Sequence, residues 1–162
     1  MRRSLIPIIK LMFVLTALMA CNTDAASPAQ NTGIDQQEDA VDSTPTTRII
    51  VRVGSQTFTA SLADNATAKA FKARLPLVIS MAELNGNEKY YNFSSSLPSN
   101  PATAGRVAAG DLMLYNANTL VLFYEAFNTS YRYTRIGKID DVSGLVAALG
   151  SGNVTVSFTL EQ

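Results

Sequence analysis

Aromatic and arginine side chains are the residues of this sequence that best suit ligand recognition. Aromatic residues recur on extended segments between positions 90 and 133, where alternation along a strand sends neighbouring side chains to opposite faces. Burial in the core is the competing interpretation for part of this set, because large aromatic side chains are usually buried. The rest can form the floor of a groove in which an arginine orients a peptide carbonyl or a carboxylate. The candidate ligand-binding residues are Tyr91, Phe93, Arg106, Tyr115, Phe123 and Arg132.

Histidine is absent from the chain, and this excludes several kinds of site. A Ser-His-Asp or Cys-His catalytic arrangement cannot form, and no histidine can act as a general base near neutral pH. The one cysteine, Cys21, cannot build a zinc site of the usual histidine and cysteine kind. The sequence also lacks a phosphate-binding loop and a dinucleotide-binding glycine motif. We therefore expect no cofactor and no metal.

Acidic residues offer a second kind of candidate chemistry. Asp140 and Asp141 are adjacent, and two neighbouring carboxylates can hold calcium or share a proton. Local structure explains these acids better, because Asp141 precedes a predicted helix and Asp111 follows a turn glycine. We expect cap and turn roles for them.

The N-terminal segment combines a basic start with a short apolar run. Arg2 and Arg3 precede an uncharged stretch, Leu11–Ala20, which ends at Leu18-Met19-Ala20-Cys21. A membrane span needs about 20 apolar residues, so an uncleaved anchor helix is the less favoured alternative. The segment resembles the signal peptide and lipobox of bacterial lipoproteins, which implies cleavage before Cys21 and acylation of that cysteine. The expected location is the bacterial cell envelope, with a lipid anchor in a membrane, on the periplasmic side or the cell surface.

The chain after the cysteine divides into a tether and a domain. Residues 22–46 contain five acidic residues, no Lys or Arg, and no aromatic residue, so they cannot bury enough apolar surface to fold. As a flexible chain they would span about 25 to 30 Å. We divide the chain into a signal peptide (1–20), the lipid-attachment cysteine with its acidic tether (21–46), and a folded domain (47–162). The ten basic and eight acidic residues of that domain are scattered, which does not predict nucleic-acid binding.

The domain is predicted to be mainly β. Alternating or apolar runs predict strands, Asn85-Gly86 predicts a tight hairpin turn, and the segment from Leu97 to Gly110 is predicted to be a long loop. A helix capped by Asp64 or Asn65 is expected to run through Lys72, and a second to follow Asp141 or Ser143. The strands are expected at 47–53, 56–62, 77–84, 88–93, 112–115, 119–124, 131–136 and 153–160, and the second helix at 144–149.

About eight short strands with two short helices favour a small closed or nearly closed antiparallel β-barrel, because closure removes exposed sheet edges. A two-sheet sandwich is the alternative.

Five motifs, in their order, resemble the bacterial cyclophilin-like domain family. They are Leu62-Ala63-Asp64-Asn65-Ala66-Thr67-Ala68, Leu75-Pro76-Leu77, Gly110-Asp111-Leu112, Leu122-Phe123-Tyr124 and Ile136-Gly137-Lys138-Ile139-Asp140. The resemblance runs from about Ile49 to Leu160 and implies a compact barrel with helices over its open ends. Cyclophilins carry an Arg beside a Phe-His pair, with Gln, Trp and His around the proline pocket, whereas this chain has no His and no Trp. No motif therefore assigns the catalytic role to Arg106, Arg132 or Arg135.

The expected function is that of a membrane-anchored, noncatalytic module that binds a peptide, a protein segment or a small ligand. A weak peptidyl-prolyl isomerase that assists protein folding in the envelope is the alternative from the enzyme class. A structural or assembly lipoprotein without pocket chemistry is the third.

Overall fold

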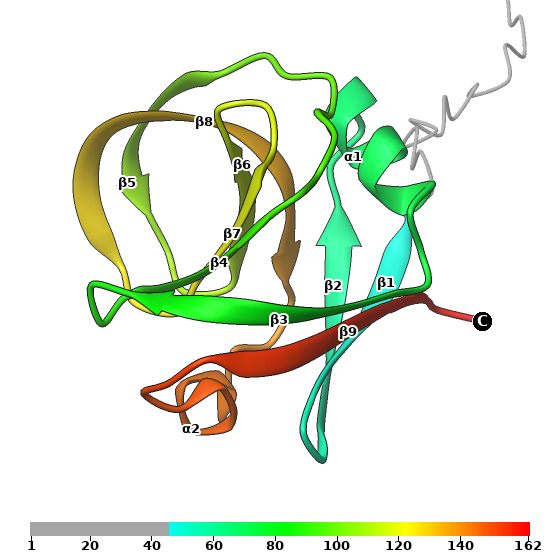
Figure 1. Cartoon of the computed structure of the whole chain (residues 1–162), viewed down its shortest axis with the longest axis vertical. Helices are drawn as coiled ribbons and strands as arrows, with labels where there is room; N and C mark the ends of the chain where they lie inside the picture. The colour runs from blue at the N-terminus through cyan, green and yellow to red at the C-terminus, as the bar shows by residue number, and fades with distance from the viewer. Residues whose placement is uncertain (1–45) are drawn as a thin grey trace, which may run out of the picture. The chain divides into compact units, whose positions relative to one another are not determined.

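The computed structural model describes residues 46–162, and within them it contains nine strands and two helices (Figure 1). The predicted signal peptide, Cys21 and the tether as far as residue 45 lie outside the described residues. The elements are β1 (Arg48–Val53), β2 (Gln56–Leu62), α1 (Ala66–Lys72), β3 (Leu77–Leu84), β4 (Glu88–Asn92), β5 (Ala102–Val107), β6 (Asp111–Tyr115), β7 (Thr119–Phe123), β8 (Phe127–Ile139), α2 (Leu145–Leu149) and β9 (Val154–Leu160).

Eight of the strands form a ring. They pair antiparallel in the order β2-β1-β9-β3-β4-β7-β6-β8, and a further pairing of β2 with β8 joins the two ends. This last pairing involves only Ala60–Leu62 and Gly137–Ile139. The domain is therefore mainly β, with an antiparallel sheet that is nearly closed, which confirms the predicted fold class.

Gly137 stands where the ring closes, and its lack of a side chain permits the closure. A Cβ atom at this position would lie 2.5 Å from the carbonyl oxygen of Ser61 and 3.2 Å from the Cα of Leu62. Such contacts are too short for any side chain, so only glycine lets the β8 backbone approach β2 this closely.

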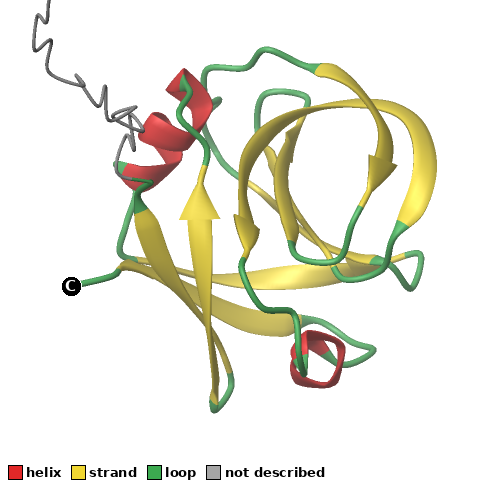
Figure 2. Cartoon of the chain, turned by 180° about the vertical axis from the view of Figure 1, so that it is seen from behind, coloured by secondary structure: helices red, strands yellow, loops and turns green. Residues whose placement is uncertain are grey.

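Strand β8 is 13 residues long and serves as a shared partner. Tyr133 pairs with Tyr115 of β6 on one edge and with Ala102 of β5 on the other. Further along β8, Gly137–Ile139 pair with β2 on the same edge as β5. Strand β5 is therefore a ninth strand that lies beside the ring. Figure 2 shows β8 curving strongly along its length.

The predicted loop from Leu97 to Gly110 was wrong for the residues of β5. This strand reads Ala-Thr-Ala-Gly-Arg-Val, a composition with little intrinsic β preference, and pairing with β8 imposes the extended conformation. A bulge between Thr103 and Gly105, with Gly105 at φ 67°, interrupts the register. Tertiary context, not local pattern, makes this strand.

The two helices begin in different ways. Asn65 caps α1, since its Oδ1 accepts a hydrogen bond from the Ala68 amide at 2.8 Å while its Nδ2 donates to the Arg135 carbonyl at 2.8 Å. The predicted cap of α2 was wrong. Gly144, at φ 81°, precedes that helix without a side-chain cap, while Asp141 accepts a hydrogen bond from the Ser143 amide at 2.9 Å in the turn before it.

Strands β6 and β7 are covered on both faces by apolar residues. Leu112 and Leu114 of β6 belong to the main core, which fills the inside of the ring, whereas Met113 packs on the opposite face. The residues of β7 alternate in the same way. The second face carries a smaller cluster made of Val107, Met113, Val121, Phe123 and Tyr133, with contributions from β5 and β8. This outer cluster forms the base of the site described below.

A buried charged network fixes the segment after α2. Lys89 is fully buried and pairs with Glu83, and its Nζ donates to the carbonyls of Gly150 at 2.8 Å and Gly152 at 2.7 Å. The Tyr124 hydroxyl donates to Glu83 at 2.8 Å. Burial alone would raise the pKa of Glu83, but the hydrogen bonds from Lys89 and Tyr124 outweigh it and lower that pKa. The network is internally satisfied and has a structural role.

Residues 46–162 contain neither a membrane-spanning helix nor a cluster of metal-ligating side chains. No helix in this part of the chain has both the length and the apolar character needed to cross a membrane. The same residues contain no group of three or more acidic, histidine or cysteine side chains placed to hold a metal ion.

Candidate ligand-binding pocket

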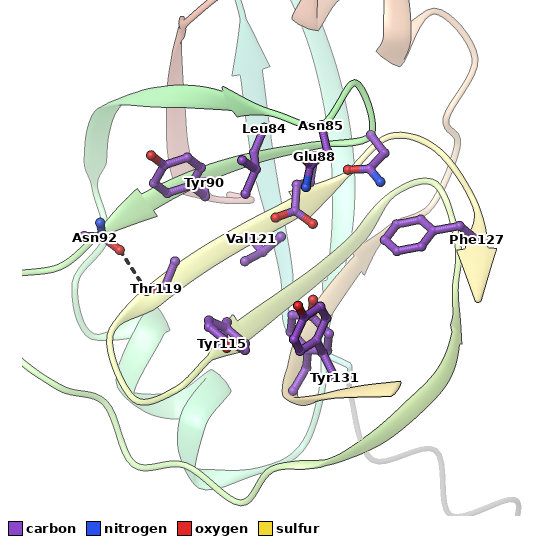
Figure 3. A pocket seen from close by; sticks show the side chains of 12 residues that line it. Leu84, Asn85, Glu88, Tyr90, Asn92, Tyr115, Thr119, Val121, Phe127 and Tyr131 are labelled. Atoms are coloured by element: carbon purple, nitrogen blue, oxygen red, sulfur yellow. Dashed lines mark hydrogen bonds between the residues drawn. The ribbon is translucent and has the colours of Figure 1, made fainter. Parts of the chain in front are cut away.

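A pocket of about 370 Å³ opens over the outer face of strands β4, β7 and β6, beside the first half of β8 (Figure 3). Most of its lining is aromatic or uncharged and polar. The lining residues are Leu84, Asn85, Asn87, Glu88, Tyr90, Asn92, Tyr115, Thr119, Val121, Phe127, Tyr131 and Tyr133.

Strand alternation selects which residues of β4 reach the pocket. Glu88, Tyr90 and Asn92 line it, while the intervening Lys89 and Tyr91 point to the opposite face. The register places Tyr90 opposite Val121 and Asn92 opposite Thr119 of β7. The Thr119 hydroxyl donates to Asn92 Oδ1 at 2.8 Å. The sheet thus holds the floor of the pocket in a fixed arrangement.

Aromatic rings make up one side of the pocket and support one another. The ring of Tyr115 lies 6.0 Å from that of Tyr131 at 81° and 5.5 Å from that of Tyr133. Phe123 lies behind them, 5.7 Å from Phe127 and 5.5 Å from Tyr133. Tyr131 is 61% exposed and forms the rim. These T-shaped and tilted contacts hold the rings against one another.

Glu88 is the one carboxylic acid among the lining residues. Only 9% of it is exposed, and no hydrogen bond or ion pair joins its carboxylate to another described residue. Burial raises the pKa of Glu88, and the negative charge of Glu83 raises it further. Burial also raises the pKa of Tyr133 to about 12, with the charge of Glu88 adding to the effect. The pocket therefore holds a poorly solvated carboxylate among tyrosine side chains.

Asn87 presents a second unpartnered group. Its Oδ1 is buried and accepts no hydrogen bond in the described part of the chain. Buried polar atoms are almost always paired, so Asn87 Oδ1 is an unsatisfied acceptor in the wall of the pocket.

No lysine or arginine is among the residues that line this pocket. Arg132 donates to the Pro101 carbonyl at 2.6 Å, and Arg135 pairs with Asp111 at 3.0 Å. Asp111 also accepts a hydrogen bond from the Ala108 amide at 2.9 Å, which is the turn role expected for it. Arg106 is exposed on β5, opposite Asn128. The basic side chains of this region are directed elsewhere.

The six candidates from the sequence do not converge on one site. Tyr115 lines the pocket, and Phe123 lies buried beneath it. Tyr91 and Phe93 belong to the main core side of the sheet, where their rings meet at 5.4 Å and Arg74 lies 4.4 Å above Phe93. Arg106 and Arg132 lie outside the lining.

Glu88 and Tyr90 were missed in the sequence, although a signal for them exists. The run Glu-Lys-Tyr-Tyr-Asn has two faces, and fixing Tyr91 and Phe93 as core places Glu88, Tyr90 and Asn92 together on the other. The sequence does not show which face is the core. That choice depends on how the ring closes.

A second cavity of about 540 Å³ lies on the far side of Tyr133, between the start of α1, the loop before β5, and β8. Thr67 donates to the Pro98 carbonyl at 2.6 Å, and Thr134 accepts from the Asn100 amide at 3.0 Å in its walls. Its polar groups are mostly engaged with the protein itself, which makes it the weaker candidate.

The chain is similar to a family of known proteins. A family model described as "Cyclophilin-like family" matches residues 51–159. No curated protein matches the chain. Among solved structures, the chain is similar to the solution structure of the hypothetical protein AF2241 from Archaeoglobus fulgidus, with 19% identity over 72% of this chain and 95% of that one, at a TM-score of 0.45. Because the family match extends over well more than half of its length, the chain belongs to the cyclophilin-like family.

Proposed function

We propose that this protein is a lipid-anchored component of the bacterial envelope whose cyclophilin-like domain is a noncatalytic binding module. The pocket over β4, β7 and β6 is its ligand site. The observation that carries the proposal is the combination of aromatic walls with the Glu88 carboxylate, which has no hydrogen-bond or ion-pair partner among residues 46–162. Pockets that bind small ligands or side chains have this composition, mostly apolar with a few convergent polar groups.

Isomerase activity is less well supported by the same geometry. Rotation about a prolyl amide has a barrier of about 18 to 20 kcal/mol, and a catalyst needs a donor or cation to polarise that amide. The lining residues supply neutral phenol, hydroxyl and amide donors but no arginine or lysine. Arg132 and Arg135 are held by the Pro101 carbonyl and by Asp111.

Binding is tested on the full chain reconstituted in lipid nanodiscs. The chain has no Trp, so its emission is that of tyrosine, and four of the tyrosines line the pocket. A library of small polar organic molecules should contain some that change this emission, and Tyr115→Leu should abolish the change. A library without a single such molecule would contradict the proposed function.

Two further assays separate the alternatives. A fatty-acid label should be incorporated into the wild-type chain in cells and lost in Cys21→Ser, which tests the lipid anchor. A protease-coupled proline-peptide assay should give no rate above background. A rate that disappears in Arg106→Ala, Arg132→Ala or Arg135→Ala would establish the isomerase instead.

A further inference from the structure

The pocket places one acidic side chain within an aromatic enclosure, and this defines the charge of its ligand. We propose that the pocket recognises an alkylammonium group, held by the Glu88 carboxylate and the faces of the surrounding tyrosines. This inference rests on the proposed function, since it names the ligand class of the same pocket.

The first argument is the burial of an unpaired charge. The whole Glu88 residue is 9% exposed, its carboxylate faces the pocket (Figure 3), and no lysine or arginine of the described chain pairs with it. A buried carboxylate without a partner is costly. Its neighbour Lys89 cannot serve, because that side chain lies on the opposite face and is bound to Glu83. The missing partner is therefore a cation from outside the domain.

The second argument is the nature of the walls. A cation over the face of a tyrosine ring is attracted by the ring quadrupole, by about 0.5 to 2 kcal/mol according to its desolvation. Figure 3 shows Glu88 on one side of the pocket and Tyr115 and Tyr131 on the other, with Val121 between them. An ammonium group inside would contact the carboxylate and the rings together.

The third argument concerns the sign of the charge. An anionic ligand would meet Glu88 with no lining cation to offset the repulsion, and Glu83 adds negative potential, as its effect on the pKa of Glu88 shows. A cationic group is attracted by both carboxylates.

The volume is sufficient for such a ligand. About 370 Å³ accommodates a short alkyl chain with its ammonium head. Two sources share this chemistry, a free primary amine and the side chain of a lysine in a peptide. The experiment below includes a probe for each.

The test uses ligand-observed NMR on the full chain in nanodiscs, with empty nanodiscs as the blank. The probes are n-butylammonium and N-acetyl-lysinamide, each matched with a neutral counterpart, 1-butanol and the Nε-acetylated lysinamide. We expect each charged probe that binds to do so at least tenfold more tightly than its neutral counterpart. Binding of butylammonium alone identifies a free amine, and binding of lysinamide alone identifies a lysine side chain.

Variants tie the binding to the pocket. Glu88→Gln should weaken butylammonium at least tenfold, while Glu161→Gln, a matched change at an exposed acid outside the lining, should leave it unchanged. Tyr131→Leu should weaken butylammonium binding severalfold, whereas Tyr131→Phe, which keeps the aromatic ring, should bind butylammonium as the wild type does. Thermal unfolding of each variant verifies that it is folded.

The outcomes are distinguishable from those for the proposed function. Equal affinity for charged and neutral probes, or full affinity in Glu88→Gln, overturns the ammonium proposal and leaves the binding function standing. The absence of binding by any probe, charged or neutral, in a folded wild-type protein overturns the ammonium proposal as well.

Discussion

Two consecutive residues of β4 carry opposite charges into opposite environments. Lys89 is fully buried on the inner side and meets Glu83 and the carbonyls of Gly150 and Gly152. Glu88 is nearly as buried on the outer side and meets no partner in the described chain. One strand therefore presents a neutralised charge to the interior and an unneutralised charge to a pocket.

The difference between these two residues separates a structural charge from a functional one. A buried ion pair with its hydrogen bonds complete holds elements together, here the segment after α2 against β3 and β4. A buried charge without a partner lowers the stability of the fold, and groups whose pKa is shifted by such burial are concentrated at functional sites. Burial alone does not distinguish the two cases, whereas the set of partners does.

Removal of Lys89 should have the largest effect on stability. Lys89→Ala leaves Glu83 without its cation and two carbonyls without their donor, so we expect the free energy of unfolding to fall by about 3 to 5 kcal/mol. Chemical denaturation measures this loss, and Lys138→Ala, at an exposed position of β8, is the control. A loss below about 1 kcal/mol, within the range of an exposed ion pair, would show that the buried Lys89 network does not stabilise the fold.

Glu88→Gln should have the opposite sign. It removes a charge that burial disfavours, and we expect the free energy of unfolding to rise by about 1 kcal/mol at pH 7. Glu161→Gln should not stabilise the protein, because Glu161 is exposed and pairs with Arg48 at 3.4 Å. Destabilisation by Glu88→Gln would show that the carboxylate has a partner in the folded protein and that its role is structural.

The pH dependence of stability should show the same opposition. The pKa of Glu88 is raised in the folded state above its ordinary value of 4.5, so the folded protein binds this proton more tightly. Its contribution to stability is present below pH 4.5 and is lost as the pH rises through the raised pKa. For Glu83 the pKa is lowered from 4.5, and its contribution is present above pH 4.5 and is lost as the pH falls through the lowered pKa.

The free energies of unfolding of the wild type and Glu88→Gln, measured against pH, isolate the contribution of Glu88 ionisation to stability. The excess stability of Glu88→Gln over wild type should grow as the pH rises from about 4.5 toward neutrality, because only the wild type must keep this buried carboxylate charged. Tyr133, with a pKa of about 12, stays neutral in this range. A difference that is constant with pH would show that Glu88 does not titrate as a buried acid.

Local chemistry explains which parts of this fold could be predicted from the sequence. Asn85 and Gly86 adopt φ angles of 59° and 72°, the positive values that a tight Asn-Gly hairpin turn requires. The flanking strands follow from the alternation of apolar and polar residues. Strand β5 could not be predicted, because its residues show no alternation of apolar and polar side chains, and its extended conformation depends on pairing with β8. The pocket could not be predicted because Glu88 and Lys89 exchange roles if the sheet faces are exchanged.

The smallest expected effect on the free energy of unfolding is that of Asn87, whose side-chain amide oxygen has no partner among the described residues. Asn65 provides the matching case of a side-chain amide with its hydrogen bonds complete. Asn87 and Asn65 are both partly buried amides, but Asn65 bonds to the Ala68 amide and the Arg135 carbonyl, whereas Asn87 Oδ1 bonds to nothing described. Asn65→Ala should lower the free energy of unfolding by about 1 kcal/mol, as loss of an N-cap does. Asn87→Ala should change it by less than about 0.5 kcal/mol, because no bond is lost and one desolvated acceptor is removed. Equilibrium urea unfolding of both variants gives the two numbers, and equal losses would mean that Asn87, like Asn65, is part of the scaffold.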